Sequence, residues 1–399
     1  MLVGIVGKPS CGKSTFFKSV TMADVAIASY PFTTIKPNRG IGHVKLKCAD
    51  RFFSVQCNPR EGYCIDGERY VPVELLDVAG LVPGAHTGKG LGNQFLDDLR
   101  QAHVLIHIVD ASGSTNENGE PVPEGSHDPA KDVLFLEQEL DLWYGAILKK
   151  PWEKFARQAY AERQKVSFAI AKQFSGLNAN EKMVADIIEK QGLDPENPTK
   201  WTEGQISGFA TELRKRTKPM IIAANKADTA AGAANYERLK QAYPNYTVIP
   251  CSAGAELALK EAAKKGVIKY SAGDSDFASL DESGITGQQK AGLRFIRQSV
   301  LQKFGSTGVQ ECLNKAVFGL LSYLAVFPGG INKLADQYGR VLPDCFLMPP
   351  NSTALDFAYK VHSDIGKGFI RAIDVKTRMT VGKEHLLKNG DVVEIISSK

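Results

Sequence analysis

One run of residues near the start of the chain has the composition and spacing of a phosphate-binding loop. Residues 7–14 satisfy the pattern G-x-x-x-x-G-K-[ST]. Glycine lets the backbone wrap so that N–H groups point at phosphate oxygens. The Lys13 ammonium can reach the β and γ phosphates, and the Ser14 hydroxyl can ligate Mg²⁺. The residues expected to hold a nucleotide here are Gly7, Lys8, Pro9, Ser10, Cys11, Gly12, Lys13, Ser14 and Thr15.

Two residues farther along could act on the same phosphates. Asp77 follows an apolar run at 73–76, and an acid at the end of a strand suits a direct or outer-sphere partner of Mg²⁺. Three residues later, the backbone N–H of Gly80 could sense the γ phosphate. The sequence D-x-x-G is common by itself, but its place after a phosphate-binding loop favours the functional interpretation.

A third group has the chemistry to select the base. An N-K-x-D sequence places Asp228 where its carboxylate can accept hydrogen bonds from guanine N1–H and the 2-amino group. Adenine has a lone pair at N1, and a site built for one polar edge can reject the other by roughly 10⁴-fold. We expect Asn225 to brace the loop and Lys226 to lie over the base. Ser252 and Ala253 follow the next apolar run, where a backbone N–H near Ala253 could donate to guanine O6.

These side chains require strands that end at one edge of a sheet. Apolar runs lead into each of them and alternate with helical patterns, at residues 2–6, 73–76, 104–109, 219–224 and 246–250. Continuous apolar strands separated by helices predict an α/β fold with a mainly parallel sheet covered on both faces.

One connection is far longer than a crossover needs, because about a hundred residues separate Asp110 from Asn225. Residues 113–129 are polar and rich in Gly and Pro, which predicts a loop. Apolar residues then recur at helical spacing on both sides of Pro151, and Trp143 and Trp152 fit its core. We predict an inserted helical, coiled-coil-like hairpin.

The remaining segments complete a domain plan. Residues 283–327 are largely helical by pattern, and the tail alternates strand and short-helix signals as a mixed α+β module does. The expected domains are a nucleotide-binding core in two parts, 1–132 and 218–335 (the second with a helical extension), an inserted helical domain, 133–217, and a tail module, 336–399.

Composition excludes several classes of protein. Of 399 residues, 43% are hydrophobic and 23% are charged, which excludes wholesale disorder. No apolar run approaches 18 residues, so we expect no membrane span. Residues 2–6 run into glycine without a basic lead, and we expect a cytoplasmic chain. The seven cysteines suit reduced thiols. Cys48, Cys57 and Cys64 contain no C-x-x-C pair, which favours plain thiols over structural zinc.

Three longer stretches resemble one family. Residues 30–38, Tyr-Pro-Phe-Thr-Thr-Ile-Lys-Pro-Asn, resemble switch I of the Obg-like P-loop proteins, and residues 77–96 resemble switch II of their YchF branch. Residues 347–358, 361–364 and 389–395 are similar to a TGS domain, a small β-grasp module. The resemblance implies a translation-associated P-loop NTPase that uses Mg²⁺ and has the ribosome as its partner.

The resemblance also assigns roles in switch and catalysis. Thr34 corresponds to the switch I threonine that would ligate Mg²⁺, with Thr33 beside it. Leu81 stands where Ras-like proteins have a water-orienting glutamine, so another group should act. Family members use a loop histidine, which makes His127 the candidate, although its spacing to the following Asp-Pro-Ala departs from the family pattern; His86 is a second candidate. The alternative for both is a solvated loop histidine. The predicted catalytic set is Lys13, Thr34, Gly80 and His127.

The base-selecting sequence departs from the YchF pattern. Bacterial and eukaryotic YchF relatives have an N-x-x-E variant and prefer ATP, whereas this chain keeps N-K-A-D. The chemistry of Asp228 therefore favours GTP as substrate, with ATP as the alternative. A metabolic kinase and an RNA-binding scaffold with a structural nucleotide are further alternatives.

The charge of the chain is concentrated. Residues 149–172 contain seven basic and two acidic residues, an excess equal to the net +5 of the whole chain. Residues 214–218 add a basic cluster, and residues 367–383 a weaker one. Localised charge favours salt-dependent contact with ribosomal RNA through the insertion and the TGS-like tail, and the alternative is a solvated helix face. We expect no membrane contact and a monomer.

Overall fold

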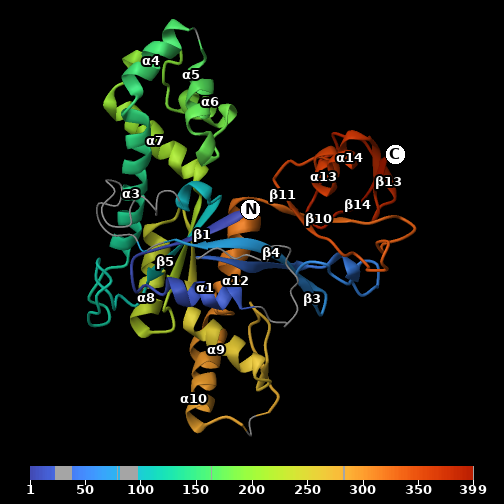
Figure 1. Cartoon of the computed structure of the whole chain (residues 1–399). Coiled ribbons are helices and arrows are strands. Elements are labelled where there is room, and N and C mark those ends of the chain that lie inside the picture. Colours follow the sequence, from blue (N-terminus) through green and yellow to red (C-terminus); the bar gives the residue numbers. More distant parts are fainter. Residues whose placement is uncertain (23–37, 79, 81–97, 163, 282–283, 399) are drawn as a thin grey trace. The chain divides into compact units, whose positions relative to one another are not determined.

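The computed structural model describes residues 1–22, 38–78, 80, 98–162, 164–281 and 284–398 (Figure 1). The predictions for Thr33, Thr34, Leu81 and His86 lie outside these residues, as does Arg163. The chain divides into two compact units. One comprises residues 1–19, 38–40 and 75–312, and the other comprises residues 20–37, 41–74 and 313–399.

A seven-stranded sheet confirms the predicted α/β core. Its order is β2 (Arg39–Lys47), β4 (Glu68–Asp77), β1 (Leu2–Val6), β5 (Val104–Asp110), β6 (Met220–Asn225) and β7 (Thr247–Cys251), and β3 (Tyr63–Ile65) pairs antiparallel with β4. The pairings β1–β5, β5–β6 and β6–β7 are parallel. Every residue of β1, β5 and β6 is buried, which explains why these strands are continuously apolar in sequence.

Helices follow the strands of the first unit in the predicted alternation. Thr229 and Ser252 cap the helices after β6 and β7, because their side chains accept hydrogen bonds from Gly232 N and Ala255 N. Helix α1 (Lys13–Thr21) follows β1, α8 (Ala230–Ala242) follows β6, and α9 (Ala253–Lys264) follows β7. The short strands β8 (Ile268–Lys269) and β9 (Ala278–Ser279) follow α9.

The insertion contains more helices than the predicted hairpin. Its long helices α3 (Ala130–Lys149) and α7 (Glu203–Thr217) pack on each other, and α4 (Trp152–Ala161), α5 (Val166–Gln173) and α6 (Glu181–Lys190) lie between them in sequence (Figure 1). Pro151 precedes α4, and Asn178 and Gly192 adopt left-handed backbone with φ of 66° and 61°. These breaks divide the segment between α3 and α7 into short helices, which the structure adds to the predicted inserted helical region.

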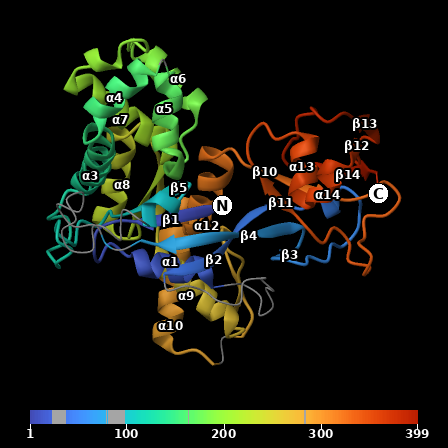
Figure 2. The ribbon, with the colours of Figure 1, turned by 45° about the horizontal axis from the view of Figure 1, so that its top comes forward.

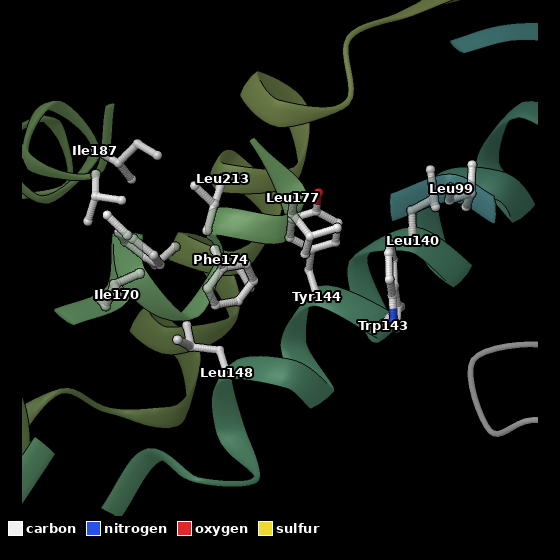
Figure 3. Packing of buried hydrophobic residues seen from close by; sticks show 14 of the residues in the cluster. Leu99, Leu140, Trp143, Tyr144, Leu148, Ile170, Phe174, Leu177, Ile187 and Leu213 are labelled. Carbon is white, nitrogen blue, oxygen red and sulfur yellow. The ribbon is translucent and has the colours of Figure 1, made fainter. Parts of the chain in front are cut away.

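One apolar cluster joins the insertion to the sheet. Figure 3 shows Leu148 of α3 and Phe174, which directly follows α5, packed together with Leu213 of α7. The cluster continues to Leu105 and Met220 of the sheet strands. Trp143 and Trp152 are buried in it as predicted, and Trp152 stacks on Trp201 with ring centroids 5.1 Å apart.

The basic cluster expected at 214–218 is only partly a surface. Arg214 is buried, and its Nε donates to Asp141 over 2.7 Å. Lys218 is also buried, donates to the carbonyls of Arg100 and Ala102, and has its pKa lowered to about 7 by burial. These two side chains connect α7 to the rest of the first unit, so they do not contribute to an exposed patch.

The stretch expected to be helical over 283–327 ends in a strand. It contains α10 (Gly287–Ile296), α11 (Gln302–Phe304), α12 (Val309–Asn314) and the π-helical turns Arg297–Leu301 and Lys315–Leu320. The apolar run that follows forms β10 (Leu324–Pro328), because it pairs with both β11 (Phe346–Met348) and β14 (Val392–Ser397) of the tail.

The second unit has its own five-stranded sheet. The order is β11 (Phe346–Met348), β10, β14 (Val392–Ser397), β12 (Phe369–Asp374) and β13 (Met379–Val381). Helix α13 (Ala354–Val361) packs on this sheet through Ala354 and Phe357, and α14 (Ser363–Lys367) follows it (Figure 2). The boundary predicted at 336 therefore falls inside this compact unit. In the described residues no helix has the length and apolar character needed to cross a membrane.

Candidate nucleotide-binding site

The loop between β1 and α1 has a backbone that only glycine can adopt at two positions. Gly7 has φ of 152°, and a Cβ there would lie 2.4 Å from the carbonyl oxygen of Ile108. Gly12 has φ of 99°, and a Cβ there would lie 2.2 Å from Asn225 Nδ2. The loop is thus packed directly on β5 and on the end of β6, which fixes its path at the sheet edge.

The residues expected at the phosphates come together at this edge. Lys13 Nζ donates to the carbonyl of Lys8 over 2.8 Å, and Ser14 is exposed in the first turn of α1. A Cβ built on Gly80 would lie 3.4 Å from Lys13 Nζ and 3.2 Å from Pro9 Cγ. The D-x-x-G segment therefore reaches the phosphate-binding loop, although the two sites are more than sixty residues apart in the sequence.

Asp77 has an unsatisfied oxygen beside Lys13. It is the last residue of β4, and its buried Oδ1 has no hydrogen-bond partner among the described residues. Burial raises the pKa of this carboxyl, and the charge of Lys13 acts in the opposite direction. An orphaned carboxylate oxygen close to Lys13 of the phosphate-binding loop fits a hard divalent cation such as Mg²⁺.

Asn225 connects the phosphate-binding loop to the loop after β7. Its Nδ2 donates to the carbonyl of Cys11 over 2.9 Å, and its Oδ1 accepts from Ala253 N over 3.0 Å. The strand register explains its position, because Asp110, Asn225 and Cys251 are aligned at the ends of three parallel strands. One buried amide thus holds two loops that each contact a nucleotide in the expected arrangement.

The geometry changes one expectation for guanine O6. The N–H of Ala253 already donates to Asn225. The next donor along the chain is Gly254 N, in the first turn of α9, where helical N–H groups lack partners within the helix. Ser252 is committed to the cap of α9.

Lys226 and Asp228 have different surroundings. Lys226 has left-handed backbone, and its Nζ donates to Asp110 Oδ2 over 2.9 Å and to Ser114 Oγ over 3.1 Å. Only its aliphatic stem is therefore free to lie over a base. Asp228 is half-buried, and within the described part of the chain its carboxylate has no hydrogen bond or ion pair.

Sequence reasoning missed the carboxylate that holds Lys226. Asp110 is fully buried at the end of β5 and also accepts from Ser112, Ser114 and Thr115. Burial would raise its pKa, but the hydrogen bonds from Ser112, Thr115 and Lys226 outweigh burial and lower it. An acid directly after a buried strand, the pattern that identified Asp77, would have identified this residue too.

His127 is connected to the phosphate-binding loop through Asp132 and Lys8. Its Nε2 lies 2.8 Å from Asp132 Oδ1, and Asp132 Oδ2 lies 2.9 Å from Lys8 Nζ. Lys8 also donates to the carbonyl of Thr115 over 2.7 Å. The side chains that make these contacts are all buried: Lys8, Asp132 and His127. The Lys8 side chain therefore anchors the phosphate-binding loop to Thr115 and Asp132. The catalytic role of His127 stays a prediction.

Family models match most of the chain. Residues 2–136 match a 50S ribosome-binding GTPase model, and residues 223–329 match the G4 motif-containing domain of Obg-like, YGR210-like GTPases. Residues 338–397 match the TGS domain. The first two matches include the phosphate-binding loop and the N-K-x-D sequence, respectively.

Several relatives match this chain over nearly its whole length. An uncharacterized GTP-binding protein of Methanocaldococcus jannaschii is 49% identical, over 100% of this chain and 99% of the relative. A ribosome-binding ATPase, YchF, of Bacillus subtilis is 27% identical over 98% of each chain. The crystal structure of a GTP-binding protein from Pyrococcus horikoshii superposes with a TM-score of 0.80, at 39% identity and with 100% of both chains covered.

Proposed function

Because the chain belongs to the YchF/Obg-like family of P-loop GTPases with a C-terminal TGS domain, we propose that it binds and hydrolyses GTP as a molecular switch. In this proposal GTP holds the segments around Thr34 and Gly80, and hydrolysis releases them. The observation that carries the proposal is that Asn225 connects two loops of the site. Three positions later, the Asp228 carboxylate has no hydrogen bond or ion pair within the described residues.

Lys13 and the backbone of residues 7–12 bind the β and γ phosphates in this scheme. Ser14, Asp77 and Thr34 would hold Mg²⁺, which supplies charge neutralisation for phosphoryl transfer when bound. Gly80 N–H reports the γ phosphate, and its approach to Lys13 supports that role. The chain supplies positioning and electrostatic stabilisation, without a covalent intermediate.

Base selection separates this proposal from its alternative. Asp228 accepts from guanine N1–H and the 2-amino group, the stem of Lys226 lies over the ring, and Gly254 N or a neighbouring N–H of α9 donates to O6. The named ATPase activity of the Bacillus subtilis relative makes ATP the alternative substrate. The carboxylate at Asp228 favours GTP because it would face the lone pair on adenine N1.

We also propose that the protein associates with the ribosome, as the name of the Bacillus subtilis relative says of that protein. The described basic residues of 149–172 support this, because all of them are exposed: Lys149, Lys150, Lys154, Arg157, Lys165 and Lys172. A cluster of exposed cations suits contact with RNA phosphates.

A competition experiment tests the nucleotide. A fluorescent GTP analogue bound to the full-length chain is displaced with GTP or ATP, for the wild type and for Asp228→Asn. We expect the wild type to prefer GTP and the variant to lose about 10- to 100-fold in GTP affinity, since hydrogen bonds to a charged group are lost. Xanthosine triphosphate has a carbonyl in place of the 2-amino group, so improved binding of it by Asp228→Asn would show that the variant is folded. Equal or tighter ATP binding by the wild type would overturn the proposal.

A further inference from the structure

Three cysteines and one aspartate of the second unit converge on one point. The thiols of Cys48, Cys57 and Cys64 and a carboxylate oxygen of Asp50 all lie within 4.8 Å of one another. Because the sequence contains no C-x-x-C pair among them, it favoured plain thiols over structural zinc. The fold brings them together because the 3₁₀ turn Ala49–Arg51 follows Cys48, the chain returns through Cys57, and Cys64 lies on β3.

Two of the separations between these atoms are close to the edges of a tetrahedral metal site. Cys48 Sγ and Cys57 Sγ are 3.6 Å apart, and Cys64 Sγ is 3.7 Å from Asp50 Oδ2. Zinc bonds of about 2.3 Å to sulfur and about 2.0 Å to oxygen give tetrahedron edges of about 3.8 Å between sulfurs and about 3.5 Å between sulfur and oxygen. Small adjustments around an ion would satisfy both pairs.

Asp50 provides an independent observation. The residue is 1% exposed, and its Oδ2 accepts from Cys57 N over 3.3 Å. Its other oxygen, Oδ1, is buried and has no hydrogen-bond partner among the described residues. A buried carboxylate that is not fully hydrogen-bonded is costly, and a cation bound to this carboxylate beside the three thiols would lower that cost.

A buried cation near the cluster offsets part of its charge. Arg69 is 1% exposed, faces Cys64 in the β3–β4 register, and donates to the carbonyls of Leu342 and Pro343 over 3.1 and 2.8 Å. Three thiolates and a carboxylate around Zn²⁺ leave two negative charges, of which Arg69 neutralises one. The soft thiolates select zinc over Mg²⁺ or Ca²⁺.

We propose that Cys48, Asp50, Cys57 and Cys64 form a structural zinc site. Three of the four ligands are buried and the fourth is half-buried, so the site is closed and has no open position for a substrate. Cys48, Ala49 and Cys57 also pack in one apolar cluster with Phe327, Leu342 and Val392. The ion would therefore hold the segment 48–64 in the shape that covers this cluster of the second unit.

Metal analysis of the full-length chain tests the proposal. The protein is purified in reducing buffer without chelators and its zinc is measured by mass spectrometry. We expect about one zinc per chain in the wild type, and far less in Cys57→Ser and Cys64→Ser. Asp50→Asn should weaken zinc about tenfold or more against a chromophoric chelator. Cys345→Ser is the matched control, because Cys345 lies beside the same apolar cluster but outside the ligand set, and it should keep its zinc.

Cobalt titration of the wild type makes the test independent of variant folding. After zinc removal, Co²⁺ should give thiolate-to-cobalt charge-transfer absorption together with the intense visible bands of tetrahedral cobalt. A wild type that carries no zinc and shows no such bands would overturn the proposal. The proposal would also be overturned if Asp50→Asn retained zinc while the control Cys345→Ser lost it. A Cys48–Cys57 disulfide in protein that has no zinc as purified, seen as two missing thiols after denaturation, would also overturn it.

Discussion

At the scale of single residues, burial and the nearby cations of the phosphate-binding loop lower the pKa of one histidine. His107 lies in the middle of β5, fully buried, and burial lowers its pKa to about 3, with Lys13 and Lys8 adding to the effect. An unfolded histidine titrates near 6.5. The unfolded chain therefore binds one more proton than the folded chain between these values, and stability falls as the pH falls through this range.

We predict that His107→Gln makes the free energy of unfolding less sensitive to acid. The His107 contribution is complete above pH 6.5 and is lost on acidification toward pH 3, by a few kcal/mol. Urea unfolding followed by tryptophan fluorescence, repeated across this pH range, measures the slope. His385→Gln is the control, because His385 is exposed. Parallel slopes for the wild type and His107→Gln would contradict the prediction.

The contacts from Lys8 through Asp132 to His127 give a second prediction at this scale. Asp132→Asn leaves the buried Lys8 ammonium without its ion pair, which costs roughly 3–5 kcal/mol of stability. Because Lys8 belongs to the phosphate-binding loop, we expect Asp132→Asn and His127→Asn both to weaken nucleotide binding, the second less than the first.

Steady-state kinetics distinguishes this positioning role from catalysis by His127. The positioning role predicts a higher KM in both variants, together with a lower melting temperature. A fall in kcat for His127→Asn with unchanged KM and unchanged melting temperature would instead assign the histidine to the chemical step.

At the scale of elements, the proposed ribosome-binding surface belongs to the end of α3 and to α4 and α5. We predict that reversing Lys150, Lys154 and Lys165 to Glu makes ribosome binding less dependent on salt, by about one unit of slope for each phosphate that the variant no longer neutralises. Co-sedimentation with ribosomes across a salt series measures this slope.

The insertion also provides a matched control for this charge reversal. Lys182, Lys190 and Lys200 are exposed on α6 and the turn after it, and their reversal to Glu changes the net charge equally. Equal effects of the two triple variants would show that total charge, and not this surface, governs binding.

At the scale of the whole molecule, the second unit is discontinuous in sequence. Leu342, Val375 and Val392 of the tail pack in one cluster with Cys48 and Phe327, which lie outside the TGS match. We predict that deleting residues 338–399 exposes the rest of this cluster and destabilises the chain. Each buried aliphatic side chain that the deletion removes contributes about 1.5–3 kcal/mol to the free energy of unfolding.

Heat unfolding and binding of a hydrophobic dye measure this effect. The truncated chain should melt at a lower temperature and bind more dye than the full chain. Tyr338→Ser, which alters an exposed residue of the same segment, should change neither. A truncated chain that melts like the full chain would show that the tail is an independent module.

The sequence by itself determined the local chemistry and the class of fold. The phosphate-binding loop, the acid of Asp77 and the continuously apolar strands are local patterns, because backbone geometry at glycine and burial on both faces of a parallel sheet constrain neighbouring residues directly. The alternation of strands with helices and the presence of the insertion follow from the same periodicities.

Only the tertiary structure decided which distant polar groups meet. Spacing could not show that Asp110 would take the Lys226 ammonium, that Ala253 N would serve Asn225, or that Arg214 would be buried. Nor could it show that Cys48, Cys57 and Cys64 face Asp50. Such contacts depend on where separate segments arrive after packing, and a buried polar group accepts whichever partner the fold brings within hydrogen-bond distance.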